Sequence, residues 1–503
     1  MKDIPVFVSV KEKCVPESLH GDKTEMANMQ SCRIPSLISA DNIVIAACDK
    51  ANCGADWGFI EIAVRRSDDS GAAFGELQTV FTPPVRIAPV RDTKYTSSFA
   101  IDPVTAQAAD GTIIMMFDFY PESKGLHKAN LLVRSNGYEK VNGEYQRKLF
   151  DKKHMYLVHD DGFVYTGDGK KTNYYLPKNH DPKYAYQTIG DMYYTDGEPE
   201  FLTEYPPLIP DNAKDKYAGN IFLKRKNRYR LSDASKKPSD NGFYDCIESS
   251  AAPMTAPVTS YLWVMKSRDG GKTWSQPEDI TPQVKTDRDE PFFGVGPGSG
   301  QRLSTGRLLI PVYSVGKAYI IYSDDGGESW NRTSFCENID ECQLAEYADG
   351  TVACLGRPEK PGAMPYSISH DGGITWQKVK NDLYSARCQH SLISVPSELY
   401  APQMDKAKDY VICSRPTGHR CKDGSRTDGC AALGEVQSDY TIRWLKELEL
   451  KTDAVYEASK EYHDFFAYSC MAVLPDGKIG ILYEAFPSGY IAFKKFETAD
   501  FFI

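Results

Sequence analysis

An eight-residue pattern, Ser-x-Asp-x-Gly-x-[Ser/Thr]-Trp, occurs three times in this chain. The copies lie at residues 267–274, 323–330 and 369–376, and a degenerate fourth copy (SDDSGAAF) lies at residues 67–74. A single Asp-Gly turn is common, but several copies of one pattern indicate that one supersecondary unit is repeated. The repeat therefore constrains the fold before any catalytic residue is considered.

Each copy predicts a tight turn between two strands. Ser and Asp side chains can accept hydrogen bonds from nearby backbone N–H groups, and the glycine supplies a positive φ. The residues before the first copy alternate in the manner of a strand, with Tyr261, Trp263 and Met265 on one face. We therefore expect a strand before each turn and an aromatic wedge after it.

The spacing of the copies predicts the architecture. They start at residues 267, 323 and 369, so they are 56 and 46 residues apart, close to the roughly 40 to 50 residues of a four-stranded propeller blade. The sequence thus predicts an all-β protein built as a β-propeller. The turns themselves are expected to have no direct chemical role, because a fold alone does not supply an activity.

The composition excludes several classes of protein. The net charge is -10, and without a basic stripe this argues against nucleic-acid binding. No stretch approaches the roughly 18 apolar residues of a membrane span, and residues 1–14 lack the layout of a signal peptide. There is no Cys-x-x-Cys and the histidines are scattered, so we expect no metal and no cofactor.

Thirteen cysteines leave at least one unpaired. The close pairs Cys48/Cys53, Cys336/Cys342 and Cys421/Cys430 suit short disulfide-bridged loops, and buried reduced thiols are an equally good interpretation.

The repeat pattern is interrupted in one region. Residues 137–227 contain no copy of the box and are crowded with Tyr, Lys, Asp and Gly, over a length that exceeds an ordinary loop. We interpret them as a small inserted β-rich subdomain, followed by a polar link at 227–241. The propeller would then comprise residues 1–136 and 228–503. Residues 440–465 are ambiguous, because a strand pattern at Ile442 and Trp444 gives way to a segment that suits a helix.

Several segments resemble the microbial exo-sialidases (neuraminidases), a family of six-bladed propellers with Asp boxes. The motif SCRIPSL at residues 31–37 is similar to the family's arginine-isoleucine-proline motif, and GADWGFIEIAVRRSDDSG, GVGPGSG and GILYE follow in the family's order. The resemblance covers the chain from about Cys32 to its end. The chain departs from the family pattern at Cys32, where an aromatic residue is usual, and in the degenerate first box.

The resemblance implies a triad of arginines at Arg33, Arg357 and Arg426, with Glu484 holding the first of them. Sialic acid carries a carboxylate on its anomeric carbon, and planar guanidinium groups bind carboxylates with two parallel hydrogen bonds. Arg426 is the weakest of these assignments, since Arg415 and Arg420 lie in the same region.

The resemblance also implies the catalytic groups. Tyr468 would be the nucleophile, Glu341 its base and Asp56 the acid/base, because a neutral phenol approaches an anionic sugar without the repulsion that a carboxylate would meet. Burial beside Trp57 would help Asp56 keep a proton near neutral pH. Asp102 is expected to contact the sugar hydroxyls and Tyr313 to line the pocket.

The expected function is a retaining exo-sialidase that releases sialic acid from glycans, glycoproteins or glycolipids through a sialyl-tyrosine intermediate. Two alternatives stay open: transfer of sialic acid to another sugar or to the substrate's own hydroxyl, and a non-catalytic sialic-acid-binding lectin. By family resemblance the protein would be secreted or held at the cell surface.

Overall fold

The structure is a computed structural model that describes residues 3–9, 31–51, 56, 58–84, 98–122, 136–151, 153–178, 188–195, 216–223, 251–286, 292–314, 317–337, 339–418, 425–450, 465–487 and 489–503. The described elements are almost all strands, with one turn of α-helix, α2 (Thr281–Val284), and the short 3-10 helices Ser397–Leu399 and Thr498–Phe502. No helix in these ranges is both long and apolar enough to cross a membrane.

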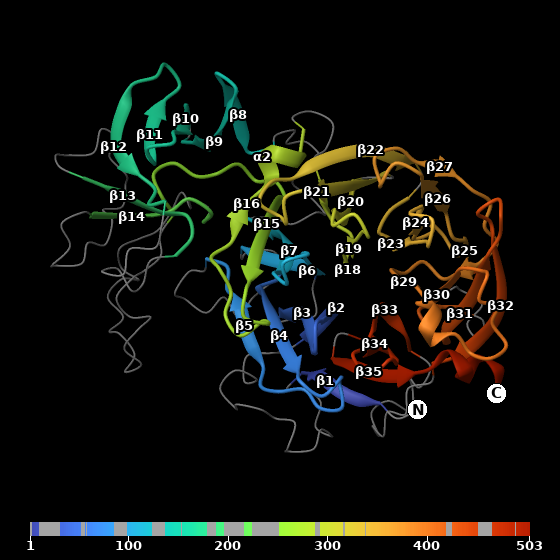
Figure 1. The fold of residues 1–503 in the computed structure, drawn as a ribbon. Coiled ribbons are helices and arrows are strands. Elements are labelled where there is room, and N and C mark those ends of the chain that lie inside the picture. Colours follow the sequence, from blue (N-terminus) through green and yellow to red (C-terminus); the bar gives the residue numbers. More distant parts are fainter. Residues whose placement is uncertain are drawn as a thin grey trace.

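Six predominantly antiparallel sheets form the blades of a propeller, which confirms the predicted fold (Figure 1). Blade 1 contains β2 (Ser31–Ala40), β3 (Ile43–Ala51), β4 (Ile60–Ser67) and β5 (Gln78–Phe81). Blade 2 contains β6 (Phe99–Gln107), β7 (Ile113–Tyr120), β15 (Tyr261–Ser267) and β16 (Glu278–Asp279), with β18 (Gly298–Ser299) parallel to β6. Blade 3 contains β17 (Gly294–Val295), β19 (Gln301–Arg302), β20 (Leu308–Ser314), β21 (Lys317–Ser323) and β22 (Asn331–Glu337).

The remaining blades complete the ring. Blade 4 contains β23 (Cys342–Glu346), β24 (Val352–Gly356), β26 (Tyr366–Ser369) and β27 (Gln377–Lys378), beside the small pair β25 (Gly362–Ala363) and β28 (Tyr384–Ser385). Blade 5 contains β29 (Ser391–Ser394), β30 (Tyr410–Pro416), β31 (Gly429–Val436) and β32 (Ile442–Glu449). Blade 6 contains β33 (Ala467–Val473), β34 (Ile479–Phe486) and β35 (Tyr490–Phe496), and the N-terminal strand β1 (Ile4–Val8) pairs with β35 as its outer strand.

The innermost strands contact one another around the axis in the order β2, β6, β19, β23, β29, β33 and back to β2. Each sheet is therefore covered on both faces by its neighbours, which explains why inner strands such as β7 (IIMMFDFY) are buried along their whole length. The apolar cores lie between adjacent blades, for example between blades 2 and 3 around Val104, Ile310 and Trp330.

The four Asp boxes connect the third and fourth strands of blades 1 to 4. In every copy the serine hydroxyl accepts the glycine N–H at 2.8 to 2.9 Å. The aspartate accepts the N–H four residues later at 2.9 Å. The degenerate first copy keeps these backbone bonds and lacks only the hydroxyl of the Ser/Thr position, now Ala73. Its aromatic residue, Phe74, packs edge-on against Phe493 of blade 6.

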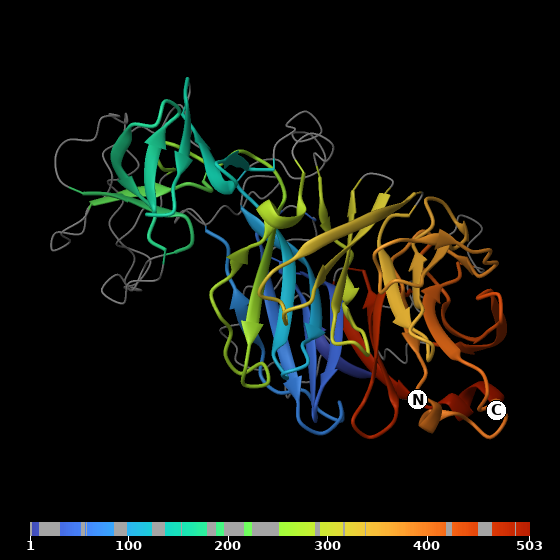
Figure 2. The ribbon, with the colours of Figure 1, turned by 45° about the horizontal axis from the view of Figure 1, so that its top comes forward.

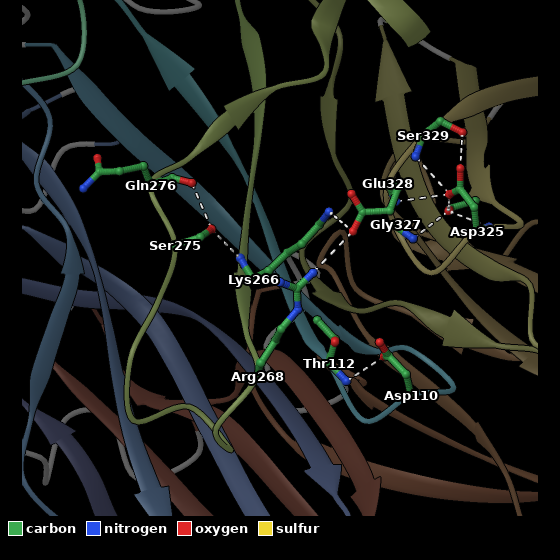
Figure 3. Close-up of polar contacts among 11 residues, drawn as sticks. Asp110, Thr112, Lys266, Arg268, Ser275, Gln276, Asp325, Gly327, Glu328 and Ser329 are labelled. Atoms are coloured by element: carbon green, nitrogen blue, oxygen red, sulfur yellow. Dashed lines mark hydrogen bonds and ion pairs between the residues drawn. The ribbon is translucent and has the colours of Figure 1, made fainter. Parts of the chain in front are cut away.

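The box at residues 323–330 also contacts the neighbouring blade (Figure 3). Glu328 lies between two cations of blade 2, with its Oε1 atom 2.8 Å from Lys266 Nζ and 3.6 Å from an Arg268 nitrogen. The boxes therefore close a hairpin and, at this position, also join one blade to the next.

A seven-stranded antiparallel sheet occupies the chain between β7 and β15 (Figure 2). Its strands pair in chain order: β8 (Tyr138–Val141), β9 (Glu144–Phe150), β10 (Met155–Val158), β11 (Phe163–Thr166), β12 (Lys171–Tyr175), β13 (Asp191–Tyr194) and β14 (Lys216–Asn220). One face shares a core with blade 2, in which Phe222 packs against Trp263 with ring centroids 5.5 Å apart. Arg147 adds an ion pair with Asp279 at 2.8 Å.

Some of the sequence-based expectations concern residues that lie partly or wholly outside the described ranges. The segment at 440–465 begins with strand β32, and residues 451–464 lie outside the described residues. The link at 227–241 also lies outside them. Each of the three suggested disulfides includes a cysteine (Cys53, Cys336 or Cys421) whose side chain is not among those described.

Candidate active site

The candidate residues come from all six blades, with Tyr313 on β20 of blade 3. Arg33 lies on β2, Asp102 on β6 and Tyr468 on β33, while Glu341 immediately precedes β23 and Arg357 immediately follows β24. Arg426 precedes β31 of blade 5. Residues far apart in the sequence therefore converge because most of them lie on an inner strand or directly beside an inner or second strand, while Arg426 lies in the connection between the second and third strands of blade 5.

Tyr468 is the centre of this group. Its side chain is 8% exposed, and its hydroxyl donates a hydrogen bond to Glu341 Oε1 at 3.2 Å. Burial and the Glu341 carboxylate raise the pKa of Tyr468 well above its ordinary value, although the three neighbouring arginines act in the opposite direction. The phenol is thus neutral, with a carboxylate in place to receive its proton.

Arg357 contacts both members of this pair. One guanidinium nitrogen donates to Glu341 Oε2, and the same nitrogen is 3.4 Å from the Tyr468 hydroxyl. Burial lowers the pKa of Arg357, but the Glu341 carboxylate and the phenol outweigh this effect and raise it. Glu341 and Arg357 come from facing ends of β23 and β24, where the Arg357 N–H also donates to the Glu341 carbonyl at 2.8 Å.

Arg33 is held by two carboxylates. Its Nε is 3.3 Å from Glu484 Oε1, on β34, and its guanidinium is ion-paired with Asp56. The side chain of Glu484 is only 1% exposed, so this partner is fixed within the protein, whereas Asp56 is at the surface.

The three arginines predicted as a triad surround one phenol ring. The Cζ atoms of Arg33 and Arg426 lie 5.4 and 5.1 Å from the centroid of the Tyr468 ring, and Arg357 is beside the hydroxyl. The structure therefore brings all three guanidinium groups to the side chain of Tyr468.

The expectation that Asp56 is buried was wrong. Its side chain is 47% exposed, and Trp57 lies outside the described residues. The reason is the ion pair with Arg33, which holds the carboxylate at the mouth of the site in contact with water. Asp56 is nevertheless adjacent to the arginine that the substrate carboxylate is expected to bind.

Asp102 and Tyr313 lie on the blade 2 and blade 3 side of the site. Asp102 is half-buried, and burial together with the carboxylates of Asp49 and Asp118 raises its pKa. Tyr313 packs edge-on against Phe292 with ring centroids 4.9 Å apart. Burial raises the pKa of Tyr313, and so do the charges of Asp102 and Glu341.

Sequence reasoning missed Asp49, on β3 directly across from Arg33. It is 3% exposed, and its carboxylate accepts the Asp102 N–H at 3.1 Å. A signal existed, since Asp49 and Lys50 are charged residues at the end of an otherwise apolar strand (IVIAACDKA). Cys388, whose Sγ accepts the Tyr468 N–H, had no such signal.

Comparison with known proteins finds relatives along the chain. Residues 243–481 match the family model described as a BNR repeat-like domain. A sialidase of Bacteroides fragilis is 32% identical over 236 residues, covering 45% of this chain and 40% of that protein. The anhydrosialidase of Macrobdella decora is 27% identical over 502 residues, covering 93% of this chain and 59% of that protein.

A solved structure matches along both chains. The intramolecular trans-sialidase from Ruminococcus gnavus superimposes with a TM-score of 0.70 at 21% identity, covering 99% of each chain. The fold and the repeats define the class: this protein is a six-bladed BNR-repeat β-propeller. Within that class, the chain is similar to the sialidases named above, and it spans 40% and 59% of the lengths of those two curated relatives.

Proposed function

We propose that this protein is an exo-sialidase that releases terminal sialic acid from glycoconjugates with retention at the anomeric carbon. The observation that carries the proposal is the convergence of Arg33, Arg357 and Arg426 on Tyr468, whose hydroxyl bonds to Glu341. Three guanidinium groups around one buried phenol have a physical purpose if an anionic sugar lies above it.

In the first step the substrate carboxylate binds the three arginines. Tyr468 Oη attacks the anomeric carbon as Glu341 takes the phenol proton, and the glycosidic C–O bond breaks. Asp56 donates its proton to the departing oxygen. The neutral phenol suits this reaction, because the anomeric centre already carries a negative charge.

In the second step water attacks the anomeric carbon of the sialyl-tyrosine. Asp56 takes a proton from this water, the bond to Tyr468 Oη breaks, and Glu341 returns the proton to the phenol. Two inversions give net retention. No step requires an added metal or cofactor.

The ion pair of Asp56 with Arg33 gives substrate binding a second role. An arriving substrate carboxylate competes for the same guanidinium and leaves Asp56 without its cation. Binding of the substrate carboxylate therefore frees Asp56 from Arg33 for its role toward the leaving oxygen.

The test is Tyr468→Phe, assayed with a fluorogenic sialoside and with sialic acid binding by calorimetry. The variant should lose turnover by at least about 10²-fold while it still binds sialic acid, because the arginines are intact. Tyr366→Phe is a matched control: Tyr366 is also buried and its hydroxyl also bonds to protein groups, Tyr347 and the Tyr440 carbonyl. Normal turnover by Tyr468→Phe would refute the proposed nucleophile.

Intramolecular transfer is a second candidate, favoured by the match to the Macrobdella decora anhydrosialidase over 93% of this chain. In that reaction a hydroxyl of the sugar itself replaces water in the second step. NMR of the first product distinguishes the outcomes: the α-anomer of free sialic acid supports hydrolysis, an anhydro sugar supports intramolecular transfer, and a new sialoside supports transfer to an acceptor. Glycan binding without turnover would favour a lectin.

We further propose that residues 137–227 form an inserted subdomain between propeller segments 1–136 and 228–503. Strands β8 to β14, which form one sheet in chain order, support this division. Residues 251 and 255, in the second propeller segment, add isolated bridges to β14 and β9. The family resemblance supports a secreted or cell-surface location, where sialylated glycans are displayed.

A further inference from the structure

Three inner strands of the propeller carry the same irregularity at the candidate site. The ladder registers shift between Arg33 and Ser36 on β2, between Ile101 and Val104 on β6, and between Ala467 and Ser469 on β33. Each shift contains one non-glycine residue with positive φ: Ile34 at 56°, Asp102 at 65° and Tyr468 at 32°. These are β-bulges in a conformation that costs energy for a residue with a side chain.

Each bulge leaves one backbone N–H outside the strand ladder, and a side chain of the preceding blade accepts it. Glu484 of blade 6 accepts the Ile34 N–H at 3.0 Å, and Asp49 of blade 1 accepts the Asp102 N–H at 3.1 Å. Cys388, which precedes blade 5 strand β29, accepts the Tyr468 N–H through Sγ at 3.4 Å. The same arrangement therefore occurs three times, each time at or beside a candidate functional residue.

Cys388 belongs to a short segment that runs alongside β33, and side chains of this segment accept N–H groups of that strand. Gln389 Oε1 accepts the Ser469 N–H and Ser391 Oγ accepts the Met471 N–H, both at 2.9 Å. Cys388 is fully buried as a free thiol and packs with Ile34, Ala467 and Tyr468. Burial raises the pKa of the Cys388 thiol, so it is present as a neutral acceptor.

We propose that Cys388 is a positioning residue for the nucleophile: by accepting the Tyr468 N–H it holds the bulge that directs the phenol toward Glu341. The inference rests on the proposed function, because it takes Tyr468 as the attacking group. Cys388 touches no substrate and exchanges no proton with it.

The physical reason is the cost of an unsatisfied donor in a buried place. Without this acceptor, the buried Tyr468 N–H can form another hydrogen bond only if the backbone leaves the positive-φ conformation. That change moves the phenol relative to Glu341. A displacement of about 1 Å is enough to lower a reaction rate by about 10²-fold. The arginines come from other strands and would keep their places.

The test compares Cys388→Ala and Cys388→Val, which remove the acceptor, with Cys388→Ser, which keeps one. The readout is the rate at which 2,3-difluoro-sialic acid labels Tyr468, followed by intact mass, with the dissociation constant of sialic acid measured in parallel. Both acceptor-free variants should label at least about 10-fold more slowly with an unchanged dissociation constant, and Cys388→Ser should label within about threefold of the unmodified protein.

Cys413→Ala is the matched control, because Cys413 is an equally buried free cysteine in blade 5 outside the site. It should label at the normal rate. Equal labelling by Cys388→Ala and the unmodified protein would overturn the proposal, as would slow labelling by Cys388→Ser or failure of both acceptor-free variants to fold. Failure of the unmodified protein to label would instead refute the proposed function itself.

Discussion

Arg33 is ion-paired with both Glu484 and Asp56, and these carboxylates have different roles because they differ in exposure. Glu484 is buried and also accepts the Ile34 N–H, so it fixes the arginine and its strand together. Asp56 is nearly half exposed and can exchange Arg33 for water or a leaving group. In the proposed mechanism, one arginine thus links the anchoring of the substrate to the protonation of the bond that breaks.

A first prediction concerns Asp56. Asp56→Asn removes the proton donor, so kcat/KM for sialyllactose should fall by about 10²–10⁴-fold. The loss should be much smaller for an aryl sialoside, since a phenolate departs without a proton. Steady-state kinetics on both substrates provide the measurement, with Asp110→Asn, at an exposed hairpin of blade 2, as the control. Equal losses on the two substrates would show that Asp56 is not the acid.

At the scale of single residues, the sequence predicted those candidate residues that lie in recognisable motifs. Arg33 follows from its Arg-Ile-Pro motif, and Tyr468 and Glu341 from their order along the chain. Asp49 had a local signal as a charged residue ending an apolar strand, and Cys388 had none. The roles of both depend on which strand of the preceding blade lies beside a bulge, and no local pattern records that contact.

At the scale of the elements, the second glycine of the Asp box at residues 323–330 has a role beyond the turn. Gly326 and Gly327 both have positive φ, at 73° and 91°. A Cβ atom on Gly326 would meet nothing within 4 Å, whereas one on Gly327 would lie 2.5 Å from Ile114 of blade 2. The first glycine is required by the backbone alone, and the second by the backbone and the neighbouring blade.

A second prediction follows from this pair. Gly326→Ala should lower the free energy of unfolding by about 1–2 kcal/mol, the cost of left-handed backbone for a residue with Cβ. Gly327→Ala should cost more, by about 1–3 kcal/mol beyond that, because the blades must separate or repack. Urea denaturation of the two variants gives the comparison, and equal costs would contradict the proposed contact between blades.

A third prediction concerns the seven-stranded sheet. Burial raises the pKa of Asp191 to about 6, against hydrogen bonds from Thr188, Asn220 and Tyr217 that lower it. The pKa of Asp191 in the folded protein exceeds its value of about 4 in the unfolded chain. Asp191 therefore contributes its full stabilisation of the folded state below pH ~4, and this contribution is lost as pH rises through 6, by roughly 3 kcal/mol. In Asp191→Asn this contribution to the pH dependence should disappear.

The measurement is the urea midpoint of both proteins at pH 4, 5, 6 and 7. Asp161→Asn, an exposed change in the same sheet, should keep the slope of the unmodified protein between pH 4 and 6. The hypothesis fails if Asp191→Asn keeps it as well.

On the scale of the whole molecule, the ring is closed by strand β1 at the outer edge of blade 6. Phe7 of β1 is fully buried in the core between blades 6 and 1, beside Cys32 and Phe493. The Cys32 thiol contacts the Phe7 carbonyl at 3.4 Å. Closure of the ring by β1 thus packs the Phe7 side chain against the last strands of the chain.

The fourth prediction tests this closure. Phe7→Ala should lower the free energy of unfolding by about 3–5 kcal/mol, because it leaves a cavity between two blades. Ile4→Ala, at a half-buried position of the same strand, should cost clearly less. Chemical denaturation of both variants provides the measurement, and similar small losses would show that β1 contributes little to ring stability.

The sequence predicted the propeller and a β-rich segment between 137 and 227, because Asp boxes mark blades and their absence marks the interruption. It did not predict that residues 4–8 complete the last blade, since five apolar residues carry no information about a partner almost 500 positions away. The packing of Phe222 against Trp263 was equally hidden, because it depends on tertiary contact and not on periodicity.

The three side chains that accept the bulge N–H groups each come from the blade before the one they serve, and one of these contacts spans the joint between blades 6 and 1. The geometry proposed for catalysis is consequently a property of the closed ring. Under the proposed function, the return of turnover during refolding would lag behind the return of the β-sheet signal, and it would report the final step of assembly.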